Sequence, residues 1–165
     1  SGGVAAGCGG PGDVGAPELK IVHLNVLLYA VNRDASGHEA IRSWWETTLA
    51  GDEPVGLPWV VLLGFLRLST NAQVFASPLG AAQAIERIDA WLDHPNIRLV
   101  RETEEHWRIL KELVSQSGTS GNLTTDAHLA ALAVSHGATL ASCDADFGRF
   151  RRVRWENPAL GSRQA

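Results

Sequence analysis

The sequence predicts an α/β fold, a three-layer sandwich around a central parallel sheet of four to five strands. Short apolar segments rich in β-branched residues alternate with longer segments of helical periodicity, which is the pattern of βαβ units. The first short segment is nearly all apolar, as in a central strand covered on both faces. Polar residues follow two of these segments directly, where a parallel sheet opens onto its ligand-binding edge.

The composition is that of one globular domain. The chain has 165 residues, of which 45% are hydrophobic and 19% are charged, and its net charge is −4. That charge excludes a surface that is basic as a whole. Cys8 and Cys143 do not indicate a disulfide framework. No segment reaches the roughly 18 apolar residues of a membrane span, so we expect a cytoplasmic protein without membrane association.

The N-terminal half begins with a segment that is expected to stay outside the fold. Residues 1–18 are rich in glycine and predict a disordered tail before a domain at 19–158. Residues 19–30 begin as a strand and turn into a short helix. The next predicted elements are a helix, a short strand and two helices, at 37–49, 55–57, 58–71 and 79–93. Gly64 costs about 1 kcal/mol relative to alanine inside its helix, which predicts close packing against a neighbour.

The C-terminal half continues the alternation. It predicts, in order, a strand, two helices, a strand, a short helix or turn, a last short strand and a tail, at 97–100, 102–116, 125–136, 138–143, 147–150, 153–155 and 159–165. Apolar residues at helical spacing predict the buried faces of the last three long helices, namely Ile85, Ile88 and Leu92, then Trp107, Leu110 and Val114, then Leu129, Leu132 and Ala133.

Three aspartates are expected to meet at the carboxyl edge of the sheet. Asp126 lies in the first turn of a predicted helix, and Asp144 and Asp146 follow a predicted strand. His23 and Asn25, near the end of the first strand, face the same crevice. Clustered carboxylates repel each other unless a cation neutralises them, and oxygen ligands favour Mg²⁺ or Mn²⁺. The alternatives are a helix-dipole partner at Asp126, an Asx-turn in the D-x-D segment and a core histidine at position 23.

Two basic features have two interpretations each. Arg67 is the only charge on its predicted helix and points either at a phosphate or at solvent. The run 151-RRVR-154 is either a nucleic-acid contact or a solvated edge. Trp44 and Trp45 are expected either in the core or on a partner surface. In the second case their helix and residues 66–68 would form a groove for a partner helix. Motifs for phosphate loops, dinucleotide binding, zincins and serine hydrolases do not occur in the sequence.

A resemblance to a known family rests on three segments, 21-IVHLNVLLYA-30, 59-WVVLLGFLRLSTN-71 and 122-NLTTDAHLAALAVSHGATLASCDADFGRF-150. Together they resemble a PIN domain, and more narrowly the VapC toxins of bacterial type II toxin–antitoxin pairs, in the actinobacterial or mycobacterial-type branch. The resemblance covers residues 19–158. It implies a Mg²⁺- or Mn²⁺-dependent endoribonuclease that cleaves RNA, often tRNA or ribosomal RNA. It also implies a small VapB-like antitoxin as partner, and a homodimer.

The resemblance assigns roles to five residues. It implies metal-site acids at Asp126 and Asp144, with Asp146 as an auxiliary carboxylate. Asn25 matches the asparagine of the first family motif, and Ser142 matches the small hydroxyl residue two places before the acid at position 144. We also expect Arg67 to support the site.

Two positions depart from the family pattern. The first motif usually reads D-x-N, and here His23 stands in place of the aspartate. Gly64 stands where a glutamate is usual. The sequence thus supports an active metal-dependent ribonuclease toxin. The alternative is a catalytically weakened or inactive PIN-fold protein that binds RNA or an antitoxin. A phosphatase of another α/β type is disfavoured, because no D-x-D follows the first strand.

Overall fold

A computed structural model describes residues 17–118 and 121–160, without the side chain of Asn122. The tails predicted at 1–18 and 159–165 lie for the most part outside the described residues. At the N-terminal boundary, Glu18 accepts a hydrogen bond from Thr139 (2.5 Å) and pairs with Arg154 (2.8 Å). None of the helices in the described part of the chain is long and apolar enough to cross a membrane.

The elements follow the predicted alternation. The strands are β1 Lys20–Val22, β2 Val55–Pro58, β3 Ile97–Val100, β4 Thr139–Ala141 and β5 Arg154–Glu156. The α-helices are α1 Leu24–Val31, α2 His38–Ala50, α3 Trp59–Ser69, α4 Ala81–Asp93, α5 His106–Ser117 and α6 Thr124–Ser135. Three short 3₁₀ turns complete the described chain, η1 Gly121–Leu123, η2 Ala145–Arg149 and η3 Pro158–Leu160.

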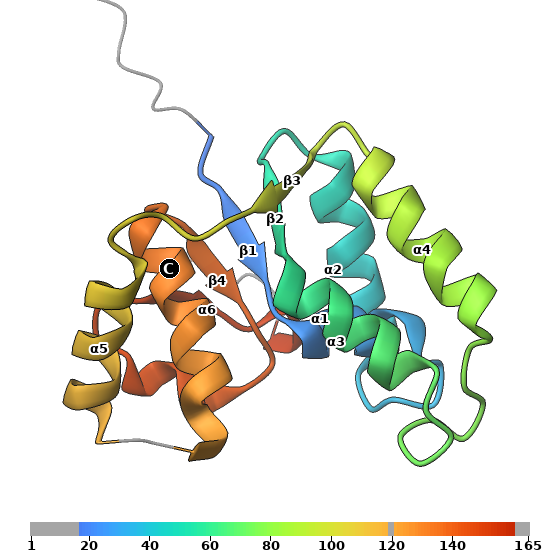
Figure 1. The fold of residues 1–165 in the computed structure, drawn as a ribbon. Helices are drawn as coiled ribbons and strands as arrows, with labels where there is room; N and C mark the ends of the chain where they lie inside the picture. Colours follow the sequence, from blue (N-terminus) through green and yellow to red (C-terminus); the bar gives the residue numbers. More distant parts are fainter. Residues whose placement is uncertain (1–16, 119–120, 161–165) are drawn as a thin grey trace, which may run out of the picture.

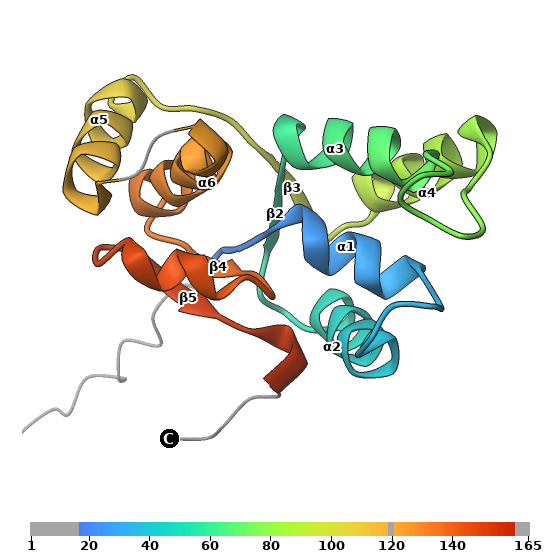
Figure 2. The same cartoon turned by 90° about the horizontal axis from the view of Figure 1, so that it is seen from below.

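The strands form one five-stranded parallel sheet in the order β3-β2-β1-β4-β5. Figures 1 and 2 show α1 to α4 on one side of this sheet and α5 with α6 on the other. Right-handed crossovers explain the division, because the chain moves outward from β1 to β3 and then returns to β4 on the opposite face. The α/β prediction with a parallel sheet is confirmed. The direction of strand order reverses between β1 and β4, and such a switch point opens a crevice at the carboxyl ends.

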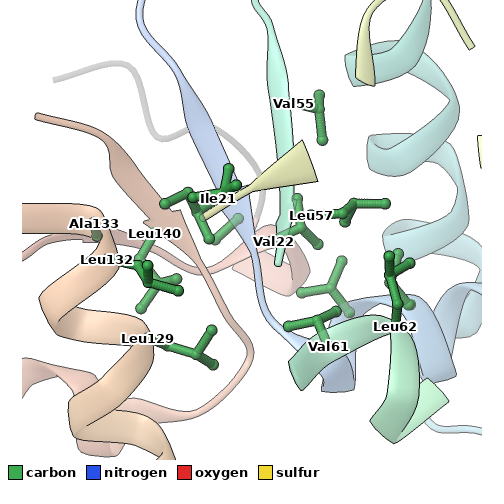
Figure 3. Packing of buried hydrophobic residues seen from close by; sticks show 14 of the residues in the cluster. Ile21, Val22, Val55, Leu57, Val61, Leu62, Leu129, Leu132, Ala133 and Leu140 are labelled. Carbon is green, nitrogen blue, oxygen red and sulfur yellow. The ribbon is translucent and has the colours of Figure 1, made fainter. Parts of the chain in front are cut away.

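The core is apolar on both faces of the sheet. Figure 3 shows Leu129 and Leu132 of α6 on one side of the strands and Val61 and Leu62 of α3 on the other. Ile21 of β1, between them, is fully buried. This two-sided burial explains why the first strand reads as a continuous apolar run and not as an alternating one.

Two predicted buried faces are wrong in part. On α4, Ile85 is 49% exposed, while Ala84 and Trp91 are buried. On α5, which begins four residues later than predicted, Trp107 is 67% exposed, and Ile109 and Leu113 are the buried residues. Both helices carry two apolar stripes that helical spacing alone does not distinguish, and the packing of the neighbouring helices selects one. On α6 all three predicted residues are buried, as expected.

The predicted partner groove is wrong at Trp45. This side chain is 5% exposed and makes an edge contact with Trp91 of α4, with ring centroids 5.9 Å apart. Trp91 in turn contacts Phe65 of α3, with ring centroids 4.7 Å apart. The three rings tie α2, α3 and α4 together in the core. Trp44 remains half-buried beside Lys20, whose Nζ lies 5.8 Å from the Trp44 ring centroid.

Candidate active site

The adjacent ends of β1 and β4 bring the predicted site residues other than Arg67 to one edge of the sheet. The backbone N–H of His23, directly after β1, donates to the carbonyl of Ala141 at the end of β4 (2.9 Å). Ser142 follows on β4. The chain reverses after α6 to enter β4, so α6 begins at the same edge and carries Asp126 in its first turn. Parallel strand ends and one helix start therefore supply the site.

Ser142 links these segments. Its Oγ accepts hydrogen bonds from the backbone N–H of Asp144 (3.0 Å) and from Nδ2 of Asn25 (3.3 Å). Oγ also lies 2.9 Å from Nδ1 of His23. The side-chain oxygen of Asn25 accepts from the N–H of Cys143 (3.2 Å). Asn25 and Ser142 thus fix the turn that carries the acids, and Ser142 itself is fully buried.

This network favours one of the two tautomers of neutral His23. The Ser142 oxygen already accepts two N–H groups, so its own hydrogen is free to donate to Nδ1 of His23. The ring hydrogen then sits on Nε2, which lies 3.7 Å from Oδ1 of Asp126. A nitrogen that carries a hydrogen has no lone pair for a metal. In this arrangement His23 faces Asp126 as a donor and does not act as a ligand.

His23 is largely shielded from solvent. Its side chain is 14% exposed, and the edge of its ring meets Phe147, with centroids 5.2 Å apart. Burial lowers the pKa of His23 to about 4, and the nearby charge of Asp144 and a hydrogen bond with Asn25 oppose this shift. His23 is therefore neutral at neutral pH and adds no positive charge to the site.

The three aspartates interact through their charges. Burial, followed by repulsion from Asp144 and Asp146, raises the pKa of Asp126 to about 6. Oδ1 of Asp144 accepts the N–H of Asp146 (2.9 Å) and caps η2, so the expected Asx-type turn is present. Asp146 also faces Arg149, whose Nε lies 3.5 Å from its Oδ1. Arg149 thus offsets part of the negative charge of Asp146.

The chemistry of the three carboxylates suits a divalent metal ion, whereas their arrangement does not form a ready-made metal site. Three carboxylates supply hard oxygen ligands. The raised pKa of Asp126 comes first from burial and then from repulsion by Asp144 and Asp146, and a divalent cation would relieve the repulsion. Yet the described residues contain no group of three or more His, Cys, Asp or Glu side chains arranged to hold a metal ion. The residues fit Mg²⁺ or Mn²⁺ by chemistry. The three carboxylates lie close enough to repel one another, but they do not form a ready-made set of three ligands.

Gly64 of α3 faces the start of α1. A Cβ at this position would lie 2.6 Å from Cδ2 of Leu24. The predicted close packing is confirmed, and its partner is the residue between His23 and Asn25. Leu24 thus fills the space beside the position where the resemblance expects a glutamate. Arg67, one turn further along α3, is exposed, and no ion pair of its side chain with a described residue is found.

Three contributing residues were missed by sequence reasoning. The i, i+3 spacing of Asp146 and Arg149 was a readable signal for their pairing. Phe147 lies next to an acid in the sequence and carries no sign that its ring meets His23. The contact of Leu24 with Gly64 joins helices that are far apart in the sequence, and only the fold brings them together.

Comparisons with known proteins identify the family. A family model described as PIN domain matches residues 23–153. The chain is 46% identical over 140 residues to Ribonuclease VapC37 of Mycobacterium tuberculosis (strain ATCC 25618 / H37Rv), covering 85% of this chain and 97% of that protein. It is 42% identical over 140 residues to Ribonuclease VapC43 of the same strain, covering 85% and 95%.

Solved structures share the fold. The structure of FitAB bound to IR36 DNA fragment matches with a TM-score of 0.64 and 17% identity, over 88% of this chain and 99% of that chain. VapBC2 from Rickettsia felis, bound to a DNA fragment from their promoter, matches with a TM-score of 0.62 and 17% identity, over 84% and 98%. The family match and the sequence identities decide the assignment: the chain belongs to the PIN-domain family and, within it, to the VapC ribonucleases.

Proposed function

We propose that this chain is an endoribonuclease toxin that hydrolyses RNA phosphodiesters and depends on Mg²⁺ or Mn²⁺. The observation that carries the proposal is the cluster of Asp126, Asp144 and Asp146 at the β1–β4 switch point of a VapC-type fold. Mutual repulsion within this cluster supports a cation as its partner.

Each site residue has a part in this proposal. Asp126 and Asp144 would hold the cation, with Asp146 as an auxiliary carboxylate. When bound, such a cation supplies electrostatic stabilisation of the phosphodiester and activation of a water. Asn25 and Ser142 keep the Asp144 turn in place through their hydrogen bonds.

An RNA cleavage assay with Mn²⁺ tests the proposal. We expect cleavage by the wild type, and its loss with EDTA and in both Asp126→Ala and Asp144→Ala. Asp89→Ala, which removes an exposed acid of α4, is the matched control and keeps full activity. Cleavage that survives the two site substitutions would assign the activity to another site or to a contaminant.

A second function has its own support. His23 is neutral and turns a hydrogen-bearing nitrogen toward Asp126, and no three-ligand group is preformed among the described residues. These observations favour weakened metal binding and a chain that acts chiefly by binding RNA or an antitoxin. Wild-type protein that binds RNA and never cleaves it, even at high Mn²⁺, would select this second function.

The family also suggests a partner and a location. VapBC and FitAB complexes are among the structures with the same fold, which supports an antitoxin as the partner. We propose a VapB-like antitoxin, a homodimer in the free toxin, tRNA or ribosomal RNA as substrate, and the cytoplasm as the site of action. Growth arrest on expression of this chain, relieved by co-expression of the neighbouring small reading frame, tests the pairing. Arrest without relief would contradict it.

A further inference from the structure

A hollow beside the acid cluster has a lining suited to phosphate. It has a volume of about 290 Å³ and is lined by Leu113, Gln116, Arg149, Phe150 and Arg151. The first two residues belong to α5, and the others lie at the end of η2 and just beyond it. Leu113 and Phe150 are buried and give the hollow an apolar floor, while both arginines are exposed. The lining contains two cationic side chains and no acid.

The basic run of residues 151–154 divides into paired and unpaired arginines. Arg152 pairs with Glu112 (2.7 Å), and Arg154 pairs with Glu18 (2.8 Å). Within the described part of the chain, Arg151 has no acidic side chain within ion-pair distance. The solvated-edge interpretation therefore fits Arg152 and Arg154, whereas the charge of Arg151 is left available to an anion.

Arg149 connects the hollow to the acid cluster. It lines the hollow, and its Nε lies 3.5 Å from Oδ1 of Asp146. A phosphodiester strand that is bound at the acids would thus find guanidinium groups directly beside it. Another basic hollow, lined by Arg33 and Arg87, includes Asp34 in its wall. An acid in the wall disfavours a phosphate, which sets the two hollows apart.

We propose that the hollow lined by Arg149 and Arg151 binds a backbone phosphate of the substrate RNA, adjacent to the phosphate that reacts. This inference rests on the proposed ribonuclease function and names a subsite for its substrate. Guanidinium groups bind phosphate oxygens in a planar, two-pronged geometry, and the buried ring of Phe150 fixes the chain to the core between the two arginines. The subsite reads charge and not base identity, because its polar groups suit phosphate oxygens.

RNA binding without cleavage tests the subsite. The probe is a short fluorescein-labelled single-stranded RNA in EDTA. Its affinity for the protein is measured by fluorescence anisotropy over a range of salt concentrations. We expect Arg151→Ala to weaken binding by about three- to tenfold and to reduce the salt slope by about 0.7, the value for one lost phosphate contact on a single strand. An uncharged morpholino of the same sequence should bind neither protein.

Two matched variants serve as controls. Arg152→Ala removes the neighbouring arginine, which is already paired with Glu112, and Arg87→Ala removes an exposed arginine of α4. Both should bind RNA like the wild type. Wild-type affinity and salt slope in Arg151→Ala would overturn the proposal, and so would an equal loss in Arg152→Ala or no RNA binding by the wild type at low salt. If Arg151→Ala weakens binding while the wild type never cleaves with Mn²⁺, the subsite stands and the nuclease assignment fails.

Discussion

His23 stands at a position where an aspartate would add a further carboxylate to the crevice. It is half-buried and neutral, and it turns Nε2–H toward Asp126, so it contributes no negative charge. His23→Asp adds a fourth carboxylate beside Asp126. We expect Mg²⁺ affinity to rise on the order of tenfold, which corresponds to about 1.4 kcal/mol.

Calorimetric titration with Mg²⁺ measures this change. His94→Asp is the control, since it adds the same charge at the end of α4 and should leave Mg²⁺ affinity unaltered. Equal affinities for the wild type and His23→Asp would contradict the idea that the histidine limits metal binding.

Leu24 and Gly64 act as a pair. Gly64→Ala should gain about 1 kcal/mol of helix propensity. In the wild type the new methyl group would lie 2.6 Å from Leu24, which has to leave its rotamer, at a cost of roughly 0.5–1.5 kcal/mol. In a Leu24→Ala background the full gain should appear. Urea unfolding of the four proteins gives the coupling energy, and identical effects of Gly64→Ala in both backgrounds would show that the pair is uncoupled.

At the scale of elements, two histidines join α5 to α6. Nε2 of His106 lies 2.9 Å from Nδ1 of His128, and one ring must accept for this contact to form. Burial and the neighbouring ring lower the pKa of His106. Burial also lowers the pKa of His128, against the opposing charge of Glu102, which lies 3.4 Å away.

These two histidines make the folded protein less stable in acid. Both folded-state pKa values lie below the unfolded value of about 6.5. Below that pH the unfolded chain binds protons that the folded chain refuses, so stability is full above about 6.5 and falls on acidification. The urea midpoint, followed from pH 8 to pH 5.5, should fall less steeply in His106→Asn than in the wild type. Parallel curves would exclude the pair as a source of acid sensitivity.

Element order and type were predictable from the sequence, whereas the inward faces of two helices were not. Side chains repeat about every 3.6 residues in a helix and every two residues in a strand, so the type of each element can be predicted from its own residues. The inward face depends on neighbours. On α4 the sets 84/88/91 and 85/88/92 have equally good helical spacing, and contact of Trp91 with Trp45 and Phe65 selects the first. No signal within α4 reports that contact.

At the scale of the whole molecule, the sheet order explains why the acids were easier to predict than their supports. Carboxylates after a strand or at a helix start meet at one edge in any fold of this type, so Asp126, Asp144 and Asp146 could be grouped from sequence. The hydrogen bonds of Ser142 with His23 and Asn25 depend on β1 and β4 being neighbours. Strand order is set by the assembled core, which no single segment encodes.

The acid cluster also sets a balance between stability and metal binding for the entire chain. The folded pKa of Asp126 is raised from 3.8 to about 6, so its ionised form destabilises the metal-free fold at pH 7.5. The loss of folding stability is largest well above pH 6. It disappears as the pH falls toward the pKa of Asp126 in the unfolded chain. The Asp126 side chain is 13% exposed, which limits solvent screening.

Asp126→Asn should therefore stabilise the protein in EDTA at pH 7.5 by about 1–3 kcal/mol. The wild type should recover stability with Mn²⁺, by about 2.7 kcal/mol at a hundred times the dissociation constant, because a cation held by Asp126 and Asp144 would neutralise their repulsion in the folded state only. Asp126→Asn should lose that response, and Asp89→Asn on α4 should retain it. Urea unfolding with EDTA and with Mn²⁺ measures both effects. A less stable Asp126→Asn protein in EDTA would mean that Asp126 supports the fold directly, and a full Mn²⁺ response in that variant would remove Asp126 from the metal site.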